Sequence, residues 1–177
     1  MRLVIYDATA GWLSFVWRVG AVLLAALGRY DAVVGVRSWG EAQHAITATR
    51  GRFRHVEVWG HGRPGAPVID SEPVAIETLA AIGTALAPSA VIWYRSCSVF
   101  QGERGQTFAA EAVNAARCTI AAHTFITWIW HSGLRTLAPG ETPRWSPLEG
   151  VDAGGRGRWS GPWHPATITF LGRGPFR

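Results

Sequence analysis

Residues 90–122 read AVIWYRSCSVFQGERGQTFAAEAVNAARCTIAA. The segment begins with the apolar run Ala90–Tyr94, continues through a helical pattern in Gln106–Ala116, and ends with a second apolar run, Cys118–Ala122. In the helical pattern the apolar residues recur at helical spacing, at Phe108, Ala112, Val113 and Ala116. A strand, a helix and a strand in this order are typical of a βαβ unit, in which the two strands run parallel.

The same alternation precedes this unit. Three further short apolar runs are Arg2–Tyr6, Asp31–Arg37 and His55–Trp59. Several of these runs are rich in β-branched residues, which is typical of strands covered on both faces. Helical patterns lie between the runs. The first is Trp12–Leu27, with Gly28 as its C-cap, and the second is a helix that begins with the capping box of Ser38 and Glu41. The third is a stripe of apolar residues at helical spacing: Ala75, Leu79, Ile82 and Leu86. The sequence therefore predicts an α/β fold of three layers, with a mainly parallel sheet flanked by helices.

The chain is expected to form a single domain over residues 1–177. With 177 residues, of which 48% are hydrophobic and 16% charged, its length lies within the usual range of roughly 100–200 residues for one domain. The core is expected at about residues 1–130. The remaining residues, 131–177, hold six of the ten prolines, which predicts loops rich in Trp, Arg, Gly and Pro and a closing strand at Thr167–Leu171.

Several classes of protein are excluded by the composition. The two cysteines, Cys97 and Cys118, are too few for a disulfide scaffold or a four-thiolate metal site. The first apolar run ends at Asp7, unlike a secretory signal, and the apolar stretch Trp12–Leu27 contains Arg18 and is shorter than the ~20 residues that span a bilayer. We therefore expect a cytoplasmic protein that does not enter a membrane.

The sequence contains no motif for a metal or a cofactor. The histidines His55, His61, His123 and His131 do not supply three metal ligands at a recognisable spacing. There is no P-loop, and the glycine-rich stretch GGRGRWSG at residues 154–161 lies after the predicted sheet rather than between a strand and a helix. We expect neither a metal nor an organic cofactor.

The basic residues of the tail leave three interpretations open. The formal net charge is +5, and the tail interleaves arginines with Trp145, Trp159 and Trp163. Such residues can stack on bases and contact phosphates, frame a cleft that holds a peptide, or pack against the edge of the sheet. We favour a peptide or protein partner over nucleic acid, whose binding would depend strongly on salt.

Two reactive side chains follow predicted strands. The run His55–Trp59 leads into Gly60-His61-Gly62, and the run Ala90–Tyr94 leads into Arg95-Ser96-Cys97. Ligands of parallel α/β sheets bind beyond the carboxyl ends of the strands. If the two strands are parallel neighbours, the imidazole and the thiol lie about one strand spacing, ~5 Å, apart at one edge. This pairing suits nucleophilic catalysis, and a turn histidine with a buried cysteine is the alternative.

The order and the flanks of these two motifs resemble those of the caspase-like cysteine peptidases, which include caspases, gingipains, separases and the self-cleaving domains of bacterial toxins. The stretches HVEVWGHGRPG (55–65) and VIWYRSCSVFQGERGQTFAAEAVNAARCTIAAHT (91–124) carry the resemblance, with the histidine and the cysteine 36 positions apart (97 minus 61). The sequence is most similar to a bacterial caspase-like domain of unknown function found in large surface proteins, in which the first strand also ends in Asp, as LVIYD does here. The resemblance covers about residues 3–125.

This resemblance implies a cysteine endopeptidase that cleaves peptide bonds through an acyl-thioester. It implies His61 as the general acid and base and Cys97 as the nucleophile. It also implies that the backbone N–H groups of Gly62 and Cys97 donate to the oxyanion.

Three further residues are candidates for substrate binding. The resemblance places Asp7 in a pocket for a basic substrate side chain, and a carboxylate that caps the next turn is the alternative. His123 and Thr124 follow the run Cys118–Ala122 and are expected at the same edge of the sheet, as substrate contacts or as plain edge residues.

Two alternatives to a general peptidase stay open. One is a catalytically silent domain that keeps the fold as a protein-interaction module. The other is a domain that processes only its own chain or a linked neighbour, with Arg156 and Arg158 in the tail as candidate cleavage sites.

Overall fold

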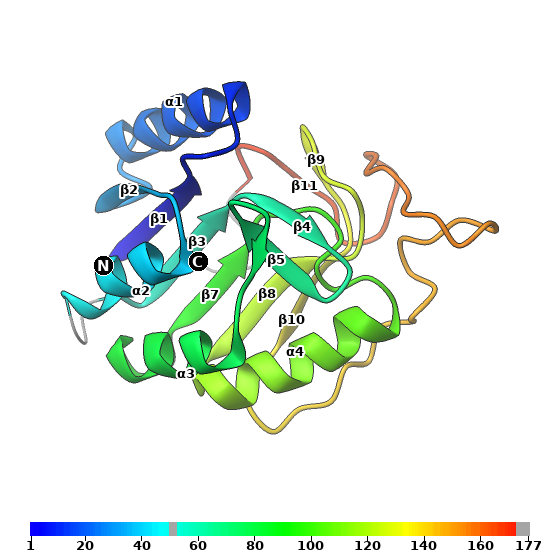
Figure 1. The fold of residues 1–177 in the computed structure, drawn as a ribbon. Helices are drawn as coiled ribbons and strands as arrows, with labels where there is room; N and C mark the ends of the chain where they lie inside the picture. The colour runs from blue at the N-terminus through cyan, green and yellow to red at the C-terminus, as the bar shows by residue number, and fades with distance from the viewer. Residues whose placement is uncertain (50–52, 173–177) are drawn as a thin grey trace.

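The computed structural model describes residues 1–49 and 53–172, and a six-stranded sheet lies at its centre (Figure 1). The strand order is β10-β8-β7-β3-β1-β2. The strands are β1 (Arg2–Asp7), β2 (Ala32–Val36), β3 (His55–Trp59), β7 (Val91–Tyr94), β8 (Thr119–His123) and β10 (Leu134–Leu137). All neighbours pair in parallel except β10, which runs antiparallel to β8. The predicted α/β class with a mainly parallel sheet is therefore confirmed.

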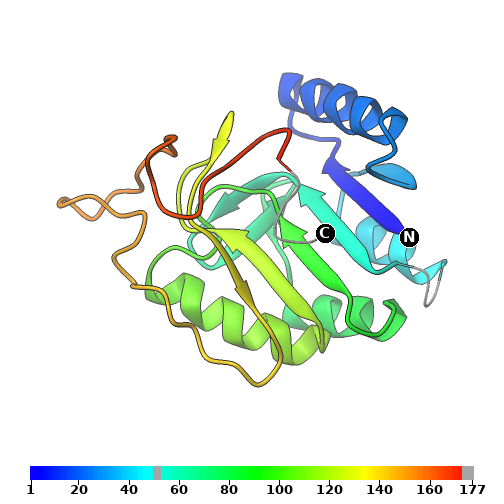
Figure 2. The same ribbon diagram turned by 180° about the vertical axis from the view of Figure 1, so that it is seen from behind.

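Helices cover both faces of this sheet (Figures 1 and 2). On one face lie α2 (Trp39–Thr47), α3 (Ile76–Ala85) and α4 (Gly102–Ala116), and on the other lies α1 (Trp12–Ala26). Successive side chains of a strand point to opposite faces of the sheet, so each strand contributes residues to both layers. In β3, Val56 and Val58 pack in the main core beneath α2–α4, whereas Trp59 packs in a second cluster with Leu24 of α1.

The predicted helix signals at Gly28 and Ser38 are confirmed. The C-cap of α1 is Leu27, and Gly28 directly after it has φ +73° and donates its N–H to Ala25 O at 2.8 Å, as a left-handed glycine after a helix does. Ser38 is the N-cap of α2, and its Oγ accepts a hydrogen bond from Glu41 N at 3.2 Å. The Glu41 carboxylate in turn accepts from the N–H of Arg37 rather than that of Ser38.

A small three-stranded meander follows β3, where the sequence suggested only a glycine-rich turn. It consists of β4 (His61–Arg63), β5 (Ala66–Ile69) and β6 (Glu72–Pro73), all antiparallel. Gly65, with φ +82°, supplies the tight turn between β4 and β5. The meander places His61 in a hydrogen-bonded strand instead of a free loop.

The expectation of loops after residue 131 is wrong for one segment. Leu134–Leu137 forms β10, and its two buried leucines pack against the sheet that it extends. The predicted closing strand is present as β11 (Ile168–Thr169), but it pairs with β9 (Trp130–His131) and not with the central sheet. Four residues with two apolar positions carry too weak a pattern to identify β10 from the sequence alone.

No helix in the described residues combines the length and the apolar character that a membrane span requires.

Candidate active site

The ends of β3 and β7 place the two predicted catalytic residues at one edge of the sheet. These strands are adjacent and parallel, with Val58 opposite Tyr94. His61 follows β3 by two residues and Cys97 follows β7 by three, so both lie beyond the carboxyl ends of the strands. This is the edge at which parallel α/β sheets bind ligands.

Gly62 brings the two loops into direct contact. A Cβ atom at this position would lie 2.4 Å from the carbonyl oxygen of Cys97, and 2.9 Å from both Ser96 Cβ and Val99 Cγ2. Real Cβ contacts are not this short. The Cys97 oxygen is a backbone atom and Ser96 Cβ is bonded to the backbone, so neither atom can move aside without moving the loop. Only glycine allows β4 to pack against the Cys97 loop in this way.

The backbone N–H groups of Gly62 and Cys97 are both available for a ligand. Gly62 lies opposite Pro67 of β5. Pro67 has no N–H, and its carbonyl accepts from Val74 N at 3.2 Å on the side of β6, so Pro67 does not pair with Gly62 through backbone hydrogen bonds. Because backbone groups alternate along a strand, the Gly62 N–H points away from β5. The Cys97 N–H donates to no acceptor within residues 1–49 and 53–172. Both amide donors therefore lack an acceptor within the described part of the chain, and their role toward an oxyanion stays a prediction.

The Cys97 thiol contacts Thr127, a residue that the sequence did not single out. The sulfur lies 3.6 Å from both the carbonyl oxygen and the Oγ1 of Thr127. The thiol is half-buried, and it is not part of a disulfide. The carbonyl can accept the S–H, and the hydroxyl can donate to a thiolate, so Thr127 can contact the sulfur in both protonation states.

His61 is exposed and its ring packs edge-on against Trp17 of α1, with 5.5 Å between ring centroids. No hydrogen bond joins this imidazole to the Cys97 thiol in the described structure. Such catalytic contacts are often long in the absence of substrate and shorten when it binds.

The loop that carries Cys97 is fixed by hydrogen bonds from both sides. Ser98 has φ +57°, an uncommon conformation for a residue other than glycine, and its N–H donates to Phe125 O at 2.9 Å. The N–H of Phe100 donates to His123 O at 3.0 Å. A left-handed residue next to the candidate nucleophile persists because its surroundings hold it there.

The tail also supports this loop. The Gln101 side-chain amide donates to Thr124 O at 3.1 Å and to Gly150 O, and Trp145 Nε1 donates to Phe100 O at 3.0 Å. Residues 145–150, which the sequence assigned to loops of undefined role, therefore hold the end of the Cys97 loop. Buried Gln101 is a positioning residue that no sequence motif identified.

Asp7 lies at the end of β1, next to the meander. Its Oδ1 accepts from the N–H and the hydroxyl of Thr9 at 2.8 and 2.6 Å, and its Oδ2 lies 3.3 Å from the N–H of Asp70. The carboxylate is buried and serves as a turn cap in the structure. A role in binding a basic substrate side chain stays a prediction.

His123 is the last residue of β8 and Thr124 follows it, and both are fully buried. His123 accepts from Trp93 Nε1 at 3.2 Å, which places its proton on Nδ1, 3.2 Å from Ser132 O. The Thr124 hydroxyl donates to Glu149 Oε1 at 2.8 Å. Both side chains have internal partners, and their predicted role as substrate contacts stays a prediction.

We expect buried His123 and His131 to make the protein sensitive to mild acid. Burial lowers the pKa of His123 to about 3 and that of His131 to about 2, below the ordinary value of about 6.5. Below about pH 6.5 each histidine binds a proton in the unfolded chain but stays neutral in the folded protein. The free energy of unfolding therefore falls by about 1.4 kcal/mol per pH unit for each histidine as the pH decreases. Urea unfolding between pH 7 and pH 5 measures this slope, which His123→Gln should reduce. An unchanged slope in this variant would contradict the prediction.

The sequence also did not identify a buried ionic network beneath the two loops. Glu57 Oε2 accepts from Tyr30 OH at 2.6 Å and Trp59 Nε1 at 3.1 Å, and lies 3.3 Å from Arg95 NH1. Its other oxygen is 3.4 Å from His55 Nε2. Burial alone would raise the pKa of Glu57, but the hydrogen bond from His55 and the charge of Arg95 outweigh it and lower that pKa to about 2. The carboxylate is therefore charged at neutral pH.

Arg95 links this network to the Cys97 loop and to the tail. It is two residues before Cys97, its NH2 donates to Phe170 O at 2.7 Å, and its guanidinium lies 4.7–5.2 Å from three aromatic ring centroids. The rings belong to Trp59, Trp93 and Phe170. Arg95 is buried and does not face the thiol as a free charge, so its role is structural.

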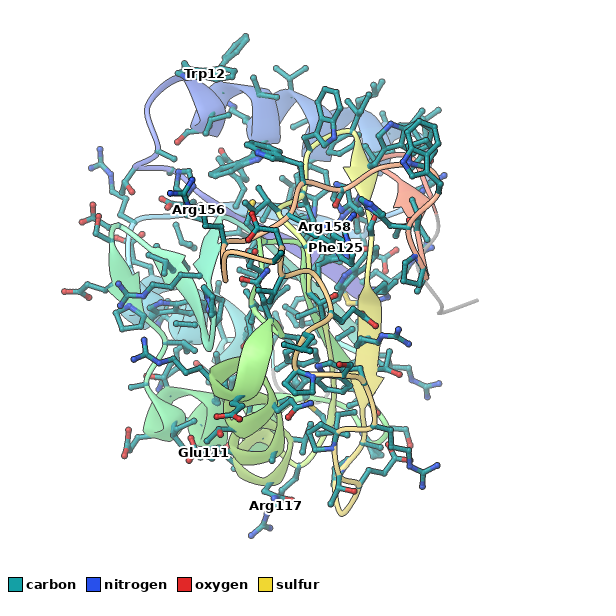
Figure 3. All side chains as sticks on the ribbon, turned by 90° about the vertical axis from the view of Figure 1, so that its right-hand side faces the viewer. Trp12, Glu111, Arg117, Phe125, Arg156 and Arg158 are labelled. Carbon is teal, nitrogen blue, oxygen red and sulfur yellow. The ribbon has the colours of Figure 1, made fainter. Side chains whose placement is uncertain are left out.

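Arg156 and Arg158 lie on one loop of the tail, and Arg158 is the nearer of the two to Phe125 (Figure 3). The ring of His164 stacks on Phe125 with 4.6 Å between centroids, and Arg158 NH2 lies 3.4 Å from His164 Nε2. Arg156 and Arg158 are both exposed. Within residues 1–49 and 53–172, no three His, Cys, Asp or Glu side chains come together as a metal site would need.

A scan against protein-family models, a search of curated proteins and a search of solved structures each gave no match.

Proposed function

We propose that the protein is a cysteine endopeptidase of the caspase-like type, with His61 and Cys97 as its catalytic dyad. The observation that carries the proposal is the close approach at Gly62, which holds the histidine strand against the loop that carries Cys97. The motif resemblance over about residues 3–125 supports the same activity.

In the first half of the reaction, His61 accepts the proton of the Cys97 thiol, and the sulfur attacks the carbonyl carbon of the scissile peptide bond. A C–S bond forms, and the carbonyl electron pair moves to the oxygen. The N–H groups of Gly62 and Cys97 stabilise this oxyanion. The C–N bond then breaks, and the His61 imidazolium gives its proton to the departing amine.

In the second half, His61 takes a proton from water while the water oxygen attacks the thioester carbon. The second tetrahedral intermediate uses the same two amide donors. Its collapse breaks the C–S bond, releases the carboxylic acid, and returns the proton to the Cys97 sulfur. All atoms come from peptide and water, so the reaction needs no cofactor.

Both cysteines, Cys97 and Cys118, are free thiols. Free thiols persist in reducing compartments, and this is the basis on which we propose a cytoplasmic location.

The test is the rate at which Cys97 reacts with iodoacetamide between pH 5 and pH 9. We expect wild type to label below the reference thiol pKa of about 8.5, and His61→Ala to label at least about tenfold more slowly at pH 6.5. Peptide mass mapping separates Cys97 from Cys118. Hydrolysis of a peptide library by wild type and by Cys97→Ala then measures the activity itself.

Cys118 is not a sufficient control for this experiment. It is buried, and burial raises the pKa of its thiol to about 12, so any exposed cysteine would react faster than Cys118. The comparison with His61→Ala is therefore decisive, and His44→Ala, at an exposed position of α2, is the matched control. If Cys97 labels equally fast with and without His61, the dyad is refuted and a catalytically silent interaction module is the better assignment.

A further inference from the structure

The outer edge of the sheet at β2 is unpaired. β2 is the last strand in the sheet order, and no strand in the described part of the chain lies beyond it. The carbonyl of Val36 faces inward, because it accepts from Ala8 N at 2.8 Å. Backbone groups alternate along a strand, so those of Val33 and Gly35 face outward. The edge carries none of the lysines or prolines that commonly protect an exposed strand.

The sequence around β2 is complementary to itself. Residues 31–37 read DAVVGVR, with Asp31 and Arg37 at equal distances from the central Val34. Asp31 and Arg37 flank the two ends of β2 (Ala32–Val36), so in an antiparallel pair of two such strands the acidic end of each copy lies beside the basic end of the other. The outward groups of Val33 and Gly35 then lie opposite each other and exchange N–H···O bonds.

Neither charge is fully used within the chain. Asp31 Oδ2 accepts from the N–H of Arg2 at 2.6 Å, while its second oxygen has no partner among residues 1–49 and 53–172. The Arg37 guanidinium has no hydrogen bond or ion pair in the same residues. Both residues are exposed and can form ion pairs across an edge.

The helix above this edge exposes a large apolar face. α1 packs on β1 and β2 through Ala21 and Leu24, while its other side faces solvent (Figures 1 and 3). Seven large apolar residues, all at least 44% exposed, lie on and just after this helix: Trp12, Phe15, Val16, Val19, Val22, Leu23 and Leu27. Four of these residues follow the spacing of three and four positions that is typical of the interface between two packed helices: Trp12, Phe15, Val19 and Val22. A monomer rarely leaves so many apolar side chains together in water.

We infer that two copies of this chain associate through the β2 edge and the α1 face, around a two-fold axis at Val34. Antiparallel pairing of the two β2 strands places that axis perpendicular to the sheet. The two α1 helices then lie on the same face of the joined sheet, beside the axis, where their apolar faces can pack together. One symmetric contact therefore covers both exposed features of the monomer.

A second copy is favoured over other occupants by the charges. A strand from a different protein would need an arginine and an aspartate at matching positions, whereas this chain supplies both in the required register. A membrane surface would use the apolar helix but would leave the backbone groups of β2 unpaired. The inference is independent of the proposed peptidase activity.

The experiment is sedimentation equilibrium of charge-reversed variants. We expect wild type to be a dimer at about 50 µM, and Asp31→Arg and Arg37→Asp each to weaken association at least about tenfold through like-charge pairs. The double variant Asp31→Arg/Arg37→Asp should dimerise again. An equimolar mixture of the two single variants should form a heterodimer, because their charges become complementary only across an antiparallel pair.

Arg117→Asp is the matched control, since Arg117 lies at the opposite end of the molecule from Trp12 (Figure 3). It changes the net charge as Arg37→Asp does and should leave the dimer intact. Recovery of association in the mixture also shows that both single variants are folded. A monomeric wild type at about 50 µM, or single variants that dimerise as well as wild type, would overturn the inference.

Discussion

Replacing Glu57 by glutamine is expected to lower the free energy of unfolding by about 3–5 kcal/mol, the usual cost of breaking a buried ion pair from one side. The Arg95 charge would lose its carboxylate partner in a buried site. The new amide would also meet Tyr30 OH and Trp59 Nε1, two donors that its own N–H₂ cannot satisfy. We expect this to be the most destabilising isosteric substitution in the protein.

The urea midpoint of Glu57→Gln, measured by tryptophan fluorescence, tests this expectation. Glu111→Gln is the control, because Glu111 is exposed on α4 and its substitution should change the free energy of unfolding by less than about 0.5 kcal/mol. Equal midpoints for the two variants would show that the network around Glu57 contributes nothing to stability.

Gly62→Ala is expected to reduce peptide hydrolysis and Cys97 labelling at low pH by about 100-fold or more, since displacing a catalytic group by about 1 Å costs a factor of this size. The added Cβ would lie 2.4 Å from the Cys97 carbonyl oxygen, so the Cys97 loop has to move. Overpacking of this kind also costs about 1–3 kcal/mol of stability. The catalytic loss should therefore exceed the loss of stability.

Gly154→Ala provides the comparison for this substitution. A Cβ at Gly154 meets only Asp152 Oδ1, at 3.4 Å, so this variant should keep wild-type activity and stability. Both variants are compared at a temperature where each is folded, as judged by circular dichroism. A Gly62→Ala protein with wild-type rates would mean that the contact between the two loops has no part in the chemistry.

The sequence predicted those parts of the molecule that depend on local periodicity. The run His55–Trp59 coincides with β3, and the cap residues Gly28 and Ser38 lie where the helix signals placed them. The shared edge of His61 and Cys97 was also predictable, because it follows from two parallel strands and the residues after them.

Other features could not be predicted, because they depend on contacts distant in sequence. The partners of Glu57 are distant in sequence, and only the fold brings Arg95 and Tyr30 to it. Likewise, Thr127 reaches the Cys97 sulfur from 30 positions away in the chain. The strands β4 and β10 are too short for their patterns to be distinguished from loops.

The bond between Arg95 and Phe170 has a consequence for the order of events during synthesis. The two residues are 75 positions apart, which corresponds to about 4–15 s of translation at about 5–20 residues per second. Throughout that interval the ring of Trp59 has no Phe170 ring to pack against, and the Arg95 guanidinium lacks its carbonyl partner. A chain that stalls before residue 170 therefore lacks both the ring that packs on Trp59 and the acceptor that holds the Arg95 guanidinium.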